Sequence, residues 1–256
     1  MMRTALPRVL MYHAFAAESR ADDPHGLFLP RARLRRHLQL LSDRNWSPLD
    51  LDGYLAVMNL GVSCRRRFLV TIDDGYRSVL DVAASEFASA GVKPVLLVPP
   101  GLIGRPAGGK VGLGDEELLS ADELVELVAR GFELGVHGLD HATMAGMTNA
   151  ELRTHTVEAR NLLADLTGSV ARSFAYPLGV LDDRAVNAVR TAGYSVAFSV
   201  TEDRGRWGIP RTAVASGDSE RVLQVMIAPW YELALRASAP LPGVRRCVRA
   251  TLNRRH

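Results

Sequence analysis

Short apolar runs rich in β-branched residues alternate with longer segments of helical period along most of this chain. Parallel strands need long crossover connections, usually helices, so this alternation predicts repeated βα units. The predicted strands are Val9–Tyr12, Phe68–Ile72, Pro94–Val98, Glu133–Val136, Ser173–Tyr176, Ser195–Ser199 and Ile209–Val214. The predicted helices are Arg31–Arg44, Asp50–Met58, Ser78–Ala90, Ala121–Ala129, Asn149–Leu166 and Asp182–Ala192. About seven such strands favour an α/β fold, an irregular (β/α)7-like relative of the eight-stranded TIM barrel.

The length of the chain favours one domain. Its 256 residues, 47% of them hydrophobic, suffice to bury one large core, and no break in composition divides them. We therefore expect a single domain over residues 1–256, with 236–256 as a basic C-terminal tail. That tail holds six arginines and no acid. Such a segment can contact anionic lipid weakly, and a terminal helix packed on the barrel is the alternative.

Charge and hydropathy exclude several classes of protein. The formal charge of +3 comes almost wholly from arginines scattered among 28 acids, without a recognition motif, so we expect no nucleic-acid partner. No segment approaches the ~18 uninterrupted apolar residues of a membrane span, and the first residues lack the apolar core of a signal peptide. These features favour a cytoplasmic protein.

Two adjacent carboxylates, Asp73 and Asp74, follow the predicted strand Phe68–Ile72 in the segment Thr71-Ile72-Asp73-Asp74-Gly75. Two acids at a strand end repel each other unless they share a cation or a proton. For such a pair by itself, a solvated Asp-Asp-Gly turn is the alternative interpretation.

Two histidines, His137 and His141, follow the predicted strand Glu133–Val136. Imidazoles four residues apart can lie on one face of a helical turn, within reach of one metal ion. By itself this spacing often arises by chance. However, the carboxyl ends of parallel barrel strands meet at one rim, and the two aspartates also lie there. The two clusters together predict a shared metal site.

At these motifs the chain resembles the polysaccharide deacetylase family (NodB-like, carbohydrate esterase family 4). The resemblance runs from Met11-Tyr12-His13 to Ile209-Pro210-Arg211 and includes Phe174-Ala175-Tyr176-Pro177-Leu178-Gly179. It implies one divalent metal, with zinc expected and cobalt, nickel, iron or manganese as alternatives. It also implies the residue roles: Asp73 as catalytic base, Asp74, His137 and His141 as metal ligands, Tyr176, Pro177 and Leu178 as the cleft loop, and the Leu178 N–H as oxyanion donor.

The sequence departs from the family pattern at two places. Many members carry an arginine where this chain has Ala175, and that arginine orients the base. In one branch an arginine arrives from a later strand, so we nominate Arg211, whose planar guanidinium could hold Asp73.

The late histidine that many members use as general acid is also missing. We nominate His13 instead, because it follows the first predicted strand and an imidazole can protonate a departing amine near neutral pH. Another histidine, His155, is interpreted as a structural residue of its helix.

The implied reaction is removal of an N-acetyl group from an amino sugar by an activated water molecule. The expected cytoplasmic location favours a small, nucleotide-linked or carrier-linked biosynthetic intermediate over a wall polymer. Two alternatives stay open: a deformylase or cyclic-amide hydrolase on the same site, and a non-catalytic sugar-binding protein. The presence of Asp73 argues against the second, because binding alone needs no base.

Overall fold

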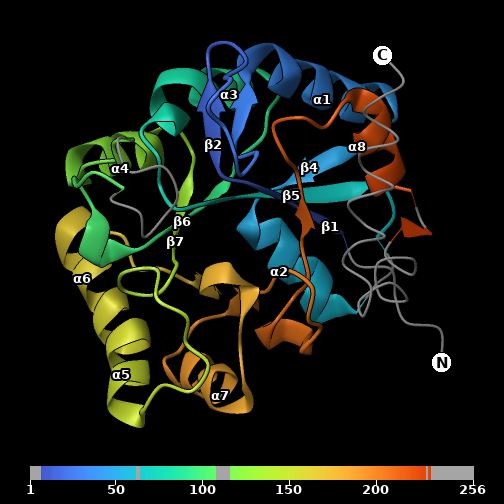
Figure 1. Ribbon diagram of the computed structural model, residues 1–256. Helices are drawn as coiled ribbons and strands as arrows, with labels where there is room; N and C mark the ends of the chain where they lie inside the picture. Colours follow the sequence, from blue (N-terminus) through green and yellow to red (C-terminus); the bar gives the residue numbers. More distant parts are fainter. Residues whose placement is uncertain (1–6, 62–63, 108–115, 229, 232–256) are drawn as a thin grey trace.

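The central element of the fold is a curled parallel sheet surrounded by helices (Figure 1). The computed structural model describes residues 7–61, 64–107, 116–228 and 230–231. The strand order is β10-β1-β5-β6-β7-β8-β9, and β4 pairs with the start of β5. The strands are β1 (Arg8–Tyr12), β4 (Ser47–Leu49), β5 (Arg67–Asp73), β6 (Val95–Val98), β7 (Glu133–Val136), β8 (Ser173–Ala175), β9 (Val196–Phe198) and β10 (Thr212–Ala213).

The two edges of this sheet approach each other through the segment that leads into β10. Ile209 forms a parallel bridge with Phe198 of β9, and Ala213 pairs with Met11 of β1. The segment predicted as a strand over Ile209–Val214 is therefore regular only at Thr212–Ala213. Pro210 has no N–H to donate to a ladder, which interrupts the strand. The α/β, (β/α)7-like fold class is confirmed.

The helices lie around the sheet, with α1 and α3 on one side and α5, α6 and α7 on another (Figure 1). Polar N-cap residues define where several helices begin. The Ser120 and Thr148 side chains each form a capping box with the glutamate three residues later. The bounds are α1 (Arg31–Asp43), α2 (Leu51–Leu60), α3 (Ala84–Ser89), α4 (Ala121–Ala129), α5 (Asn149–Arg153), α6 (Ala159–Thr167), α7 (Asp183–Thr191) and α8 (Glu220–Met226).

Two predicted helices contain π-helical turns. The helix predicted over Ser78–Ala90 begins with the π turn Val79–Ala83 before α3, and Thr154–Glu158 forms a second π turn between α5 and α6. The predictions missed β4, α8 and a small parallel pair formed by β2 (Ala14–Ala16) and β3 (Phe28–Pro30). The missed strands have three residues each, too few to display an alternating pattern.

Side chains of the strands alternate between two apolar clusters. Val70 and Ile72 of β5 pack outward against the helices, whereas Leu69 faces an inner cluster with Val9, Leu97 and Tyr54 of α2. Because the side-chain period of a strand is two, Thr71 and Asp73 continue the inner row toward the carboxyl end. The sheet thus directs a polar side chain into the rim of an apolar interior.

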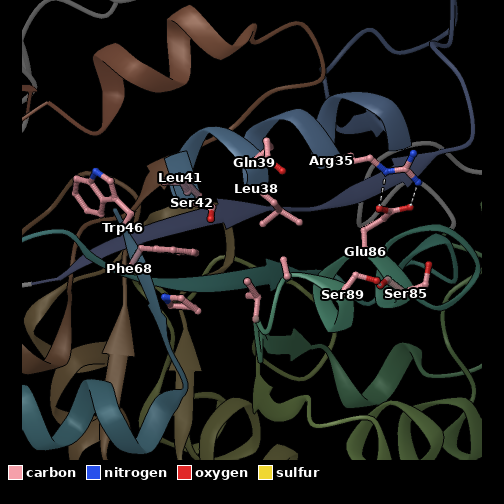
Figure 2. Close-up of a pocket in the computed structure, with 13 residues that line it drawn as sticks. Arg35, Leu38, Gln39, Leu41, Ser42, Trp46, Phe68, Ser85, Glu86 and Ser89 are labelled. Atoms are coloured by element: carbon pink, nitrogen blue, oxygen red, sulfur yellow. Dashed lines mark hydrogen bonds and ion pairs between the residues drawn. The ribbon is translucent and has the colours of Figure 1, made fainter. Parts of the chain in front are cut away.

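A groove of about 490 Å³ lies between α1 and α3, on the outer side of the sheet. Figure 2 shows the Arg35–Glu86 ion pair at one end and Trp46 with Phe68 at the other. None of the predicted site residues lines it. Among the described residues, no helix is long and apolar enough to cross a membrane. The predicted C-terminal tail, residues 236–256, lies outside the described residues.

Candidate active site and metal centre

The predicted site residues gather at the carboxyl ends of adjacent strands. Asp73 ends β5, His137 follows β7, and His13 follows β1, whose last residue, Tyr12, pairs with Ile72. Because all these strands are parallel, their ends reach the same rim of the barrel. The backbone therefore brings together chain segments that lie far apart in the sequence.

Asp74, His137 and His141 form a cluster in which one ligand atom from each residue lies within 4.8 Å of the others. Oδ1 of Asp74 is 3.4 Å from Nε2 of His141 and 3.7 Å from Nε2 of His137. All three side chains are largely buried. Oδ1 of Asp74 accepts no hydrogen bond from the residues that the structure describes. A buried carboxylate oxygen in this position requires a proton or a cation.

The chemistry of these donors fits a divalent cation. Nδ1 of His137 lies 2.8 Å from the carbonyl oxygen of Ala175, so it carries the proton and leaves the lone pair on Nε2 toward the cluster. Burial lowers the pKa of His137 to about 3, which keeps the imidazole neutral. Burial and the adjacent Asp73 carboxylate raise the pKa of Asp74 well above its usual range. One carboxylate and two imidazoles are a typical ligand set for zinc.

The backbone at this cluster differs from the predicted helical turn. Gly138 and His141 have φ angles of 67° and 64°, which a right-handed helix does not allow. The two imidazole rings instead meet across a loop, with centroids 4.9 Å apart. Asp74 also lies in the left-handed region, with φ of 73°. Such conformations in non-glycine residues are uncommon and concentrate at functional sites.

Asp73 is bound by Arg211 through two hydrogen bonds. Nη1 and Nη2 of Arg211 donate to the two carboxylate oxygens at 2.6 and 2.7 Å. Nε donates to the carbonyl of Ser199 at 3.0 Å, and Nη1 lies 3.2 Å from the Thr71 hydroxyl. Burial opposes ionisation of Asp73, but the charge and hydrogen bonds of Arg211 outweigh it and hold the pKa of this carboxyl below its usual range. The side chain is therefore an oriented carboxylate.

His13 lies beside this pair and is half-buried. Burial lowers its pKa most, the Asp73 carboxylate opposes this shift, and the charge of Arg211 adds to it. His13 is therefore neutral at pH 7. These interactions show that His13, which follows β1, lies near the Asp73–Arg211 pair.

The loop after β8 contains the predicted cleft residues Tyr176, Pro177 and Leu178. The Tyr176 ring is fully buried, and its hydroxyl donates to the carbonyl of Trp207 at 2.9 Å. Pro177 is buried, whereas Leu178 is 66% exposed and has φ of 58°. Gly179 packs so closely on Val200 that an added Cβ would lie 2.5 Å from Cγ2. This packing fixes the turn that presents the Leu178 peptide.

The sequence interpretation missed a contact made by His155. Its Nδ1 accepts a hydrogen bond from the N–H of Leu139, between the two histidines of the cluster, at 3.1 Å. The side chain is buried on the π turn Thr154–Glu158. The only signal in the sequence is a histidine on a helix that follows the cluster. Histidines on helices are too common for this signal to identify a site residue.

Comparisons with known proteins identify similar folds and a family. No protein of curated function matches the sequence significantly. A deacetylase from Streptococcus pyogenes, PplD, solved with acetate, is similar in fold, with a TM-score of 0.77 at 17% identity over 88% of this chain and 100% of that chain. A polysaccharide deacetylase from Bacillus cereus superposes with a TM-score of 0.71 at 20% identity over 86% of this chain and 68% of that chain.

A third fold neighbour is IcaB from Ammonifex degensii, with a TM-score of 0.69 at 21% identity over 91% of this chain and 99% of that chain. At these identities the likeness concerns the fold. The sequence profile of polysaccharide deacetylases matches residues 62–197, more than half of the chain. This region includes both aspartates and both histidines of the cluster. The chain therefore belongs to the polysaccharide deacetylase family, a family of hydrolytic enzymes that act on acetylated sugars.

Proposed function

We propose that the protein is a metal-dependent N-deacetylase that hydrolyses the acetamide of an amino sugar. The observation that carries the proposal is that a set of metal ligands and an oriented carboxylate lie side by side at one rim of the barrel. Asp74, His137 and His141 converge as a ligand set, and the neighbouring Asp73 is an oriented carboxylate on Arg211. A bound divalent cation would polarise the substrate carbonyl and lower the pKa of a water molecule.

Asp73 acts as the general base in this proposal. Its two oxygens are bound by Arg211, so the carboxylate is ionised and fixed in orientation before substrate arrives. It takes the proton of the water molecule that attacks the acetyl carbon. Because Arg211 is also anchored to the carbonyl of Ser199, the base has little freedom to rotate.

His13 is the proposed acid, and the Leu178 N–H is the proposed donor to the oxyanion. His13 is neutral in the resting enzyme because burial lowers its pKa. As the acid, it would first take up a proton, either the one that Asp73 removed from the water molecule or one from solvent, and would then pass it to the departing amine. The close packing of Gly179 on Val200 supports this role of the Leu178 N–H, because it would hold the turn at Leu178 in one conformation.

For the substrate, we propose a small, nucleotide-linked or carrier-linked N-acetyl amino sugar. The proposed zinc identity and this substrate class are tested together. Protein loaded with Zn²⁺ or Co²⁺ is incubated with free, nucleotide-linked, lipid-linked and polymeric N-acyl amino sugars, beside an Asp73→Asn control, and acetate and formate are quantified.

Acetate from one substrate class, absent in the control, is the expected result. Formate would identify a deformylase, and a ring-opened acid from cyclic amides would identify a cyclic-amide hydrolase. No product from any class, with the cation fully bound, would contradict the catalytic proposal and leave sugar binding as the function.

A further inference from the structure

The peptide of Leu139, midway between His137 and His141, is held from both sides. Its carbonyl accepts a hydrogen bond from the N–H of Gly101 at 2.7 Å, just beyond β6. Its N–H donates to Nδ1 of His155 at 3.1 Å. The loop that carries two ligands of the proposed metal site is therefore anchored through its centre as well as through its ends.

The His155 imidazole is fixed in one tautomer by this contact. Because Nδ1 accepts the Leu139 N–H, the proton of the neutral ring lies on Nε2, which is 3.8 Å from Oδ1 of Asp140. The side chain is only 10% exposed. Gly138 makes room for it: a Cβ at that position would lie 3.3 Å from Nδ1 of His155 and 3.1 Å from Cγ of Pro177.

The π turn Thr154–Glu158 aims the ring. A π turn inserts one extra residue, which rotates side chains before it by about 100° relative to those after it. Leu152 of α5 and Leu163 of α6 both stay in the core, while His155 points to the ligand loop. The turn is itself supported, because the Thr156 hydroxyl donates to the carbonyl of Leu152 at 2.7 Å and the Thr156 carbonyl accepts from the Tyr194 hydroxyl at 2.9 Å.

We propose that His155 is a positioning residue that holds the His137–His141 loop in the conformation that binds the cation, through acceptance of the Leu139 N–H by Nδ1. The proposal rests on the cation site proposed above. Outer groups of this kind orient the ligands, and their loss weakens metal affinity about 10–100-fold. His155 is buried beside Gly138 and therefore belongs to the site, although a loop and α5 separate it from His141 in the sequence.

Two amide variants of His155 test this role. His155→Asn places an amide oxygen at the position of Nδ1, so it can still accept the Leu139 N–H. His155→Gln places its amide at the position of Nε2 and leaves that N–H without an acceptor. Both are polar and of similar volume. Zn²⁺ affinity of the full chain is measured by competition with a chromogenic chelator, and exchange of the Leu139 amide is measured in the absence of metal.

We expect His155→Asn to bind Zn²⁺ within about threefold of the wild-type protein and His155→Gln to bind it about tenfold or more weakly. The Leu139 amide should exchange faster only in His155→Gln. Arg160→Ala is the control on the same helical segment: it loses hydrogen bonds to the Ala171 and Ala192 carbonyls and should lower the Tm without changing affinity.

Equal affinity and equal Leu139 exchange in the two variants would overturn the role of His155. Weak binding in Arg160→Ala to the same degree as in His155→Gln would assign the effect to helix stability and also overturn it. A wild-type protein that binds no Zn²⁺ would refute the cation site, and Leu139 exchange would still decide whether His155 holds the loop.

Discussion

Arg211 and Asp73 are 138 positions apart in the sequence, yet they form a bidentate ion pair in the interior of the barrel at 2.6 and 2.7 Å. Their side chains are 1% and 3% exposed. An arginine directly before β10, the strand that pairs with β1, thus binds the last residue of β5. We propose that this pair takes the role of the orienting arginine that many family members carry where this chain has Ala175. It also links the segment directly before β10 to the proposed base.

Removal of the guanidinium should both destabilise the fold and alter the pH profile. In Arg211→Met, Asp73 stays buried without a partner, so we expect a loss of about 3–5 kcal/mol in the free energy of unfolding. The pKa of Asp73 should rise, which would move the acid limb of kcat/KM to higher pH. Urea denaturation and a pH–rate profile measure the two effects.

The control is Arg204→Met, which breaks an exposed ion pair with Asp183 and should lower the free energy of unfolding by less than about 1 kcal/mol. An equal loss of stability in the two variants would contradict a special role for the buried pair.

The adjacent aspartates should separate in function. Asp73→Asn should retain the cation while kcat falls by about 10²–10⁴, because the base is lost. Asp74→Asn should lose the cation, because its Oδ1 faces both histidines. Metal content after gel filtration, measured for both variants, distinguishes the roles. Loss of metal in Asp73→Asn with retention in Asp74→Asn would reverse the assignment.

Much of the fold could be predicted from local patterns. The strand Glu133–Val136 and the helix Ala121–Ala129 have the predicted bounds. A capping box at Ser120 defines the start of the helix, and Gly131 separates it from the strand. Parallel topology then placed both clusters at one rim. The short strand Ser47–Leu49 contains a proline and three residues only, so no periodicity signalled it.

The finer geometry of the site is not encoded in such patterns. The pairing of Arg211 with Asp73 came from resemblance, since nothing near either residue specifies the other. The contact from His155 depends on a π turn, and the sequence Thr154–Glu158 has no local feature that distinguishes it from an α-helix. The left-handed backbone at His141 likewise results from the loop as a whole.

His13 should contribute to turnover without contributing to metal binding. His13→Ala should lower kcat by about 10²–10⁴ if it is the acid, with unchanged metal content. His25→Ala, which removes an exposed histidine, is the matched control and should behave like the wild-type protein. Steady-state kinetics of both variants, with metal content measured in parallel, tests this role. Wild-type kcat in His13→Ala would exclude it as the acid.

Stability should fall in mild acid because of His37, which is fully buried under α8. Its Nε2 lies 2.9 Å from the carbonyl oxygen of Asp218, and burial lowers its pKa to about 4. The unfolded chain binds the proton near pH 6.5, so stability present above that pH is lost as the pH falls toward 4, by about 3 kcal/mol in total. His37→Gln keeps an N–H at the Nε2 position and cannot titrate.

Urea denaturation of both proteins between pH 7 and pH 4 measures this contribution. The wild-type protein should lose more stability over that interval than His37→Gln. Parallel curves would show that His37 does not control the acid sensitivity.

Acetate release as a function of metal occupancy tests the central claim most directly. The protein is stripped with a chelator and titrated with Zn²⁺, and turnover of the best N-acetylated substrate is followed at each step. The account predicts no activity in the stripped protein and a linear rise that saturates at one equivalent, with no rise in Asp74→Asn. Full turnover in the stripped protein, or saturation only at two equivalents, would contradict a single Asp74–His137–His141 centre.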